Sequence, residues 1–230
     1  MDAGRLYRRL LQHYGPQDWW PAEHPFEVMV GAVLVQNTTW TNAERAVARL
    51  REARCLSLEW LAELSDADLA ELIRASGTFR VKATRLKNLA TALRDGGGLD
   101  ALDVMSTEDA RRFLLRISGV GAETADAILV YALGRPAFVV DAYARRLMQR
   151  LTGHQPSDER LRGETTAALP DSAALGELHA LIVAHGKLHC GSQPRCNGCP
   201  LAAVCTTAEK TRQADARQSA EKPSADTLRR

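Results

Sequence analysis

Four cysteines crowd into one short window near the end of the chain, at Cys190, Cys196, Cys199 and Cys205. Their spacing, Cys-x5-Cys-x2-Cys-x5-Cys, sets one close pair between two single cysteines. Structural zinc sites usually combine two close pairs across a longer stretch, whereas each iron of a four-iron cluster takes one thiolate. The spacing therefore predicts a 4Fe-4S cluster, and a zinc site is the alternative.

A lone carboxylate, Asp141, follows the turn Gly119-Val120-Gly121 at a distance of about one helix. A Gly-x-Gly turn between two helices exposes backbone N–H groups at the start of the second helix. Together with the helix dipole, these groups attract an anion such as a DNA phosphate. By itself the pattern also fits an ordinary helical turn followed by an N-cap aspartate.

Aromatic and basic side chains add two further candidate groups. Trp19 and Trp20 are adjacent in a proline-punctuated loop, where they could stack on a base or pin the N-terminal helix to the core. The basic residues gather around two segments: Arg80, Lys82, Arg85, Lys87, Arg145 and Arg146. Contact with phosphates would make affinity fall steeply with salt, and the alternative is a set of solvated helix faces.

The composition is that of a folded protein, with 45% hydrophobic and 25% charged residues. The formal net charge is +2 over 230 residues, so any nucleic-acid site must come from local clustering. No apolar signal-peptide core and no run of about 18 apolar residues is present, so we expect a cytoplasmic protein without a membrane partner.

Helical periodicity dominates the chain and predicts an all-α fold. Glycine, proline and capping residues divide the pattern into successive helices. The expected helices cover about 4–14, 26–36, 41–54, 58–64, 66–76, 81–95, 106–117, the segment from the hairpin glycines to Leu133, 141–151, 157–168 and 171–189.

The segment LLRISGVGAETADAILVYALGRPAFVVDAYARRL, followed by the four cysteines, resembles the helix-hairpin-helix (HhH-GPD) DNA glycosylases of the endonuclease III superfamily. GAVLVQNT and FRVKATRLKNL also look like that family's pattern. The resemblance covers roughly residues 5–205. It implies two helical domains flanking a DNA-binding cleft. Residues 25–139 would form a six-helix domain, 1–24 and 140–207 a cluster domain, and 208–230 a disordered tail.

By this resemblance, Asp141 is the catalytic aspartate, whether or not it is also an N-cap. Breaking the glycosidic bond builds positive charge on the sugar, which a fixed carboxylate stabilises while it orients or deprotonates the attacking water. Bifunctional members carry a lysine two residues after the second hairpin glycine, where this chain has Glu123. Glutamate cannot form a Schiff base, so we expect a monofunctional glycosylase.

The WWP segment, GAVLVQNT, Glu123 and AHGKLH together look similar to the 3-methyladenine branch of the superfamily. This implies that a flipped base enters a pocket formed by Trp19, Trp20, Glu123 and Lys187. An alkylated purine is cationic, and tryptophan faces and carboxylates would attract it.

The resemblance further implies a monomer that binds double-stranded DNA containing a damaged base and associates with the nucleoid when bound. Gln36 would fill the gap left by the flipped base, although it could instead cap a helix C-terminus. The residues expected to contact DNA are Gln36, Asn37, Arg80, Lys82, Gly119, Val120, Gly121 and Thr124.

Two other functions stay open on the sequence. An endonuclease III-like glycosylase would remove oxidised pyrimidines with weak or absent AP lyase activity. A non-catalytic helix-hairpin-helix protein would bind DNA without any need for Asp141.

Overall fold

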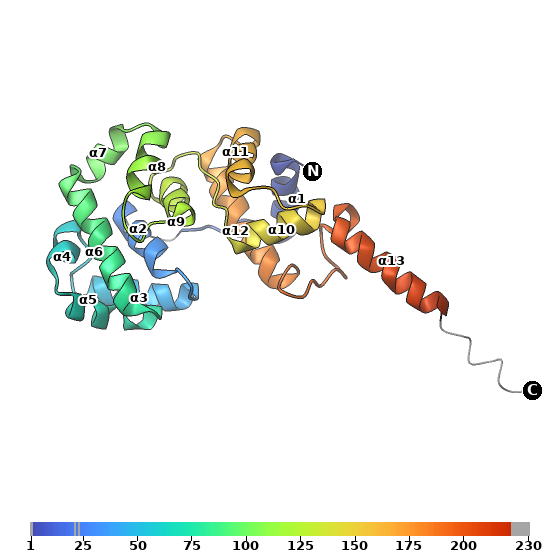
Figure 1. Cartoon of the computed structure of the whole chain (residues 1–230), viewed down its shortest axis with the longest axis horizontal. Coiled ribbons are helices and arrows are strands. Elements are labelled where there is room, and N and C mark those ends of the chain that lie inside the picture. Colours follow the sequence, from blue (N-terminus) through green and yellow to red (C-terminus); the bar gives the residue numbers. More distant parts are fainter. Residues whose placement is uncertain (1, 21, 23, 222–230) are drawn as a thin grey trace, which may run out of the picture. The chain divides into compact units, whose positions relative to one another are not determined.

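The computed structural model describes residues 2–20, 22 and 24–221, with side chains as far as residue 214. Within these ranges every element is helical, and no strand forms. The all-α prediction is confirmed (Figure 1). None of the described helices combines the length and apolar composition that crossing a membrane requires.

The chain divides into two units, and neither is continuous in sequence. The first unit comprises Met1–Gln17, Val140–Ala168 and Leu178–Arg230. The second comprises Asp18–Val139 and Leu169–Glu177. The sequence had placed residues 18–24 and 169–177 with the N- and C-terminal segments. They belong with the larger unit because Trp20 packs on Trp40 and Tyr131, and Gly176 accepts a hydrogen bond from Tyr131.

The larger unit holds the helices on either side of the hairpin. They are α2 (Pro25–Leu34), α3 (Trp40–Glu52), α4 (Leu58–Glu63), α5 (Asp66–Leu72), η1 (Arg74–Ser76), α6 (Phe79–Asp95), α7 (Gly98–Val104), α8 (Thr107–Leu115), α9 (Ala122–Ala127) and the π-helical turn η2 (Ile128–Ala132). Every residue of α2 from Phe26 to Leu34 is buried, and this helix packs against α3, α6, α9 and η2. A helix that is apolar on every face except at Glu27, which pairs with Arg51, must lie inside the core, and this accounts for its strand-like composition.

The smaller unit contains α1 (Ala3–Tyr14), α10 (Ala142–Thr152), α11 (Asp158–Ala168), the part of α12 (Ser172–Leu188) from Leu178 onward, η3 (Ala202–Val204) and α13 (Thr206–Glu221). Within it α10 packs against α13, and α1 packs against α11. The cysteine-bearing loop lies between α12 and α13.

Two elements correct the sequence prediction. The predicted end of a helix at Gly96-Gly97-Gly98 is confirmed, because α6 ends at Asp95, but the sequence prediction lacks α7, which begins at Gly98 after Gly97 turns the chain with φ 96°. The tail was predicted to be disordered from residue 208, yet α13 continues to Glu221. Its alanines, glutamates, lysines and arginines favour a helix without needing a core, and low hydropathy hid this tendency. Residues 222–230 lie outside the described part of the chain.

Candidate functional site

The hairpin turn between α8 and α9 is shaped by its glycines. Gly119 has φ 97°, and a Cβ atom placed on it would lie 2.2 Å from Cγ of Arg85. Any other residue would be strained at this φ and would collide with α6, so glycine is required here. Val120 is buried, and Gly121 is the exposed N-cap of α9.

A buried ion pair joins the two helices of the hairpin. Nε of Arg111, on α8, donates to Oδ1 of Asp126, on α9, at 2.7 Å, and the second guanidinium nitrogen donates to Oδ2 at 3.3 Å. The two side chains are 13% and 3% exposed. A two-point contact between a guanidinium and a carboxylate fixes orientation as well as distance, so it sets the angle of the hairpin.

Gln36 is bonded to the hairpin. Its Nε2 donates to the carbonyl of Gly119 at 3.3 Å and to Oγ1 of Thr124 at 2.8 Å. Its Oε1 accepts a hydrogen bond from Arg85. Gln36, which is expected to fill the gap left by a flipped base, thus also stabilises the hairpin turn that is expected to bind the DNA strand. Its neighbour Asn37 is exposed and has φ 53°.

Lys82 is a clear correction, because the residue expected to bind phosphate is 1% exposed. Its Nζ donates to the carbonyl of Leu34 at 2.8 Å and to the carbonyl of Ser76. These carbonyls stand at the C-terminal ends of α2 and η1, where a helix leaves acceptors without intrahelical partners. Burial, with a smaller contribution from Arg85, lowers the pKa of Lys82.

The other basic residues also divide into exposed and engaged side chains. Arg80 is exposed, with its guanidinium 5.5 Å from the centre of the Phe79 ring. The remaining partners are Asp66 for Lys87, Gln36 for Arg85, Asp158 for Arg145 and the Cys190 carbonyl for Arg146. The number of basic residues in the sequence therefore overstates how many basic side chains are available to contact DNA.

Asp141 is the N-cap of α10, with 8% of its surface exposed. Its Oδ1 accepts the backbone N–H of Ala144 at 2.7 Å. Its Oδ2 lies 3.6 Å from Nε2 of His179, on α12. Burial raises the pKa of Asp141, but His179 and the backbone N–H groups of Ala144 and Tyr143 outweigh it, so the pKa is below its usual value. The carboxylate is therefore ionised at neutral pH in spite of its burial.

The aromatic residues of the larger unit form a cluster around Trp20. Its ring meets that of Trp40 edge-on at 4.8 Å and that of Tyr131 at 5.4 Å. A Cβ atom on Gly31 would lie 3.0 Å from the Trp20 ring, so this glycine makes room for the indole. Trp19 is 38% exposed. The sequence prediction missed Trp40, although it stands two residues beyond GAVLVQNT. Pro21 lies outside the described residues.

Glu123 and Lys187, the other predicted pocket residues, lie in different units. Glu123 is exposed in the first turn of α9. Lys187 is exposed in the last turn of α12, where its carbonyl accepts a hydrogen bond from Arg195.

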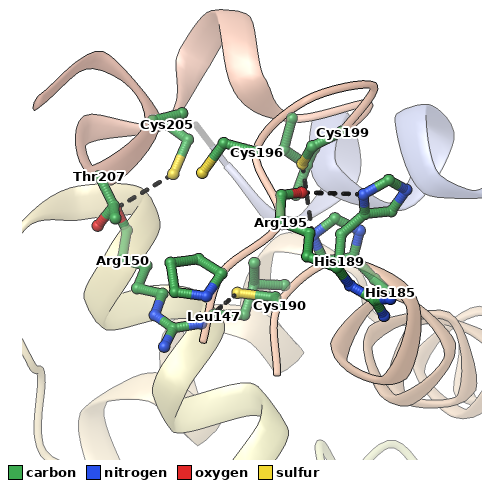
Figure 2. Close-up of a pocket in the computed structure, with 13 residues that line it drawn as sticks. Leu147, Arg150, His185, His189, Cys190, Arg195, Cys196, Cys199, Cys205 and Thr207 are labelled. Atoms are coloured by element: carbon green, nitrogen blue, oxygen red, sulfur yellow. Dashed lines mark hydrogen bonds between the residues drawn. The ribbon is translucent and has the colours of Figure 1, made fainter. Parts of the chain in front are cut away.

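The four cysteines line one pocket in the smaller unit. Figure 2 shows Cys190, Cys196, Cys199 and Cys205 around this pocket, together with Leu147 and Arg150 of α10. The four thiols are free, and burial raises the pKa of Cys199. The described residues include no group of three His, Cys, Asp or Glu side chains already placed to hold a single metal ion.

Hydrogen bonds surround the sulfur atoms of this pocket. Nη1 of Arg150 donates to Sγ of Cys190 at 3.4 Å, and Nε2 of His185 lies 3.9 Å from Sγ of Cys199. Nδ1 of His185 is bonded to the Tyr14 hydroxyl at 2.8 Å. Burial, assisted by His189 and His13, lowers the pKa of His185 to about 4, so its ring is neutral at neutral pH.

Comparison with known proteins gives a consistent result. The family described as HhH-GPD superfamily base excision DNA repair proteins matches residues 30–170. A protein of Methanocaldococcus jannaschii that is named as a DNA repair glycosylase is 40% identical over 207 residues, covering 87% of this chain and 94% of its own. Endonuclease III of Thermotoga maritima is 30% identical over 182 residues, covering 79% and 82%.

A solved structure agrees with these sequence relatives. The 3-methyladenine DNA glycosylase MagIII of H. pylori, bound to 1,N6-ethenoadenine, superposes with a TM-score of 0.72 at 27% identity. The match covers 81% of this chain and 98% of that one.

Proposed function

The chain belongs to the HhH-GPD superfamily of base excision DNA repair proteins and is a DNA glycosylase, and we propose that it is a monofunctional enzyme for alkylated purines such as 3-methyladenine. The observation that carries the catalytic part of this proposal is Asp141. It is a buried carboxylate that stays ionised, held at the N-terminus of α10.

Asp141 would stabilise the transition state of glycosidic bond hydrolysis. As the bond between C1′ and the base nitrogen breaks, the base takes the electron pair and the sugar becomes positively charged. A fixed carboxylate in a site of low dielectric stabilises that charge, and water then attacks C1′ and gives its proton to a base or to solvent. The lowered pKa of Asp141 favours this electrostatic role, because the group is already ionised before the reaction begins.

The absence of a lyase step is proposed from the hairpin. Strand cleavage by the family's covalent route needs an amine that attacks C1′ and forms an imine. The corresponding position holds Glu123, in the first turn of α9. A carboxylate has no nitrogen to form that bond, so the product would be an intact strand with an abasic site.

The preference for alkylated purines is proposed from the aromatic cluster and from the likeness to MagIII. Trp20 and Trp40 offer π faces and edges in one place, with Trp19 more exposed beside Trp20 in the sequence. A cationic purine gains about 0.5–2 kcal/mol over such a ring, which a neutral lesion does not. The positive charge also makes the base a better leaving group, so weaker acid assistance suffices.

Arg80 and the backbone of the hairpin turn are the groups proposed to contact DNA phosphates. Arg80 is exposed, and Gly121 precedes a helix start with free N–H groups. We propose that the protein acts as a monomer on a damaged duplex. The logarithm of affinity then falls linearly with the logarithm of salt concentration, and each phosphate that the protein neutralises makes this slope steeper by about one.

We also propose that the four pocket cysteines hold a 4Fe-4S cluster. Such a cluster takes one thiolate for each iron, which suits four thiols that line one pocket. When bound, the cluster would supply a cross-link that stabilises the loop between α12 and α13. The chain's own contribution includes an N–H group of Arg150, which donates a hydrogen bond to Sγ of Cys190.

The activity is tested with a panel of duplexes that contain 3-methyladenine, 7-methylguanine, 1,N6-ethenoadenine, thymine glycol, uracil or a mismatched adenine. Single-turnover base release is scored as strand breaks after alkali, and lyase activity as breaks without alkali. We expect release of the methylated purines and breaks only after alkali. A borohydride-trapped protein–DNA adduct would contradict the proposed absence of lyase chemistry.

The catalytic aspartate is tested with Asp141→Asn beside a matched N-cap control, Asp171→Asn. Asp171 accepts the N–H of Ala174 at 2.9 Å but is exposed. Asp141→Asn should retain duplex binding and lose base release, whereas Asp171→Asn should retain both. Equal base release by the wild type and Asp141→Asn would exclude a catalytic role and favour a DNA-binding protein.

The second candidate function is removal of oxidised pyrimidines, which the 30% identity to endonuclease III favours. A preference for thymine glycol over the methylated purines would establish it and overturn the alkylation proposal.

The cofactor is tested independently of activity. Anaerobically purified protein should be brown, absorb broadly in the visible range and contain iron. Colourless protein with one equivalent of zinc would replace the cluster by a zinc site.

A further inference from the structure

His179 is a polar residue within an apolar helical segment. Its neighbours on α12, Leu178, Ala180, Leu181, Ile182 and Val183, are all buried, and His179 itself is 7% exposed. Burying an imidazole costs free energy unless a partner satisfies it. The helix would pack as well or better with an apolar residue here, so the histidine calls for an explanation.

A contact with Asp141 offsets part of this cost through charge, since its length exceeds that of a hydrogen bond. Nε2 of His179 lies 3.6 Å from Oδ2 of Asp141, and the two side chains are 9% and 12% exposed. The other oxygen of the carboxylate, Oδ1, is held by the N–H of Ala144 at 2.7 Å. The two oxygens therefore face two different elements, α10 through its own backbone and α12 through one side chain.

We propose that His179 is a positioning residue for glycosidic bond hydrolysis, which acts by holding Oδ2 of Asp141 while the helix N-terminus holds Oδ1. The inference rests on the catalytic role proposed for Asp141 and names the residue on which that role depends. His179 acts through Asp141, and no contact between His179 and the DNA is needed.

Two physical effects follow from this arrangement. A carboxylate held by one hydrogen bond keeps some freedom to rotate about its Cβ–Cγ bond, and a contact to the second oxygen restricts that rotation and sets the plane of the group. A misplacement of about 1 Å in a reacting group can reduce a rate 100-fold. The imidazole also favours the ionised carboxylate, which burial would otherwise disfavour.

Other ionisable residues on α10 and α12 have partners of their own. Arg145 and Arg146, on α10, contact Asp158 and the carbonyl of Cys190. His185, further along α12, is bonded to Tyr14. The remaining contributions to the pKa of Asp141 are burial and the backbone N–H groups of Ala144 and Tyr143. A change of pKa on substituting His179 can therefore be traced to the imidazole.

The test compares His179→Gln with His179→Leu in single-turnover base release over a pH series. Glutamine carries an N–H donor at nearly the position of imidazole Nε2, whereas leucine fills the space without a donor. His179→Leu should lower the rate roughly 10- to 100-fold, the effect of removing a residue that supports a reacting group. The acidic limb of the pH–rate profile of His179→Leu should also move to higher pH, because the ionised form of Asp141 loses stabilisation. His179→Gln should stay close to the wild-type rate.

Thermal denaturation of each variant separates positioning from folding. Equal loss of rate and of thermal stability in both variants, with an unshifted acidic limb, would reduce His179 to a structural residue and overturn the inference. Wild-type rate and pH profile in His179→Leu, with Asp141→Asn inactive, would overturn it and leave the proposed function standing. Base release by Asp141→Asn would instead remove the proposed function itself.

Discussion

Replacing Lys82 by methionine separates a structural role from a DNA contact. The ammonium group of Lys82 donates to the carbonyls of Leu34 and Ser76 from a position that is 1% exposed. Methionine matches the length of the alkyl chain and carries no donor. The substitution leaves both carbonyls buried beneath α6 without the group that satisfied them.

The expected loss follows from those two acceptors. A buried polar group that loses its partner costs about 1–3 kcal/mol, so two carbonyls cost about 2–6 kcal/mol. The burial that lowers the pKa of Lys82 shows that the charged group itself is unfavourably placed, and its removal returns part of this cost. We expect a net decrease of about 3 kcal/mol in the free energy of unfolding. At about 2–4 °C for each kcal/mol in a chain of this size, the melting temperature falls by about 6–12 °C.

The assay combines thermal denaturation with a salt series of duplex binding, and Arg80→Met is the matched control. Arg80 is exposed on the same helix, so its loss should leave the melting temperature nearly unchanged. It should reduce the slope of log affinity against log salt by about one. Lys82→Met should show the reverse, with lower stability and an unchanged slope. A Lys82→Met protein of wild-type stability with a reduced salt slope would refute the capping role and restore the phosphate contact.

Three further changes test the hairpin and Asp141. Asp126→Ala leaves Arg111 buried without the carboxylate of Asp126 and should lower the free energy of unfolding by about 3 kcal/mol in urea denaturation; an unchanged free energy would contradict a stabilising role of this ion pair. Gly119→Ala meets Arg85 at a φ of 97° and should cost about 2 kcal/mol while weakening duplex binding in anisotropy measurements. Because the pKa of folded Asp141 is below the usual 3.8, its charge stabilises the fold above about pH 4 and stops doing so as pH falls through the folded pKa. The stability difference between the wild type and Asp141→Asn should therefore be constant near neutral pH and shrink below about pH 4, and a difference that grows there would contradict the sign.

The helices and their boundaries could be predicted well because local patterns decide them. Ser106 and Asp141 cap helices whose starts the sequence located within a residue. The α2 segment reads as apolar in every direction because it lies at the centre of its unit. The missed helix α7 begins at the last of three successive glycines, and the burial of Leu102 is what reveals why it forms.

The roles of individual polar side chains could not be predicted, because they depend on which face of a helix meets which partner. Lys82 and Arg80 stand two positions apart in one basic run, yet one is a buried cap and the other is exposed. Gln36 was assigned to DNA, and its bonds to Gly119 and Thr124 arise across 83 and 88 residues of sequence. The sequence offers one clue to His179, which is that it is a histidine within an apolar run.

The discontinuity of the smaller unit has a consequence for how the protein is made. The bond between Tyr14 and His185 joins residues 171 positions apart, so α1 leaves the ribosome long before its partners exist. At about 5–20 residues per second, the wait is roughly 10–30 s. Until α11 and the later segments are synthesised, Leu6 and Leu10, which are buried in the finished protein, lack the native surfaces that cover α1. Helix α1 is thus synthesised long before it can find its place, and a nascent chain that is shielded during this delay should give the higher yield.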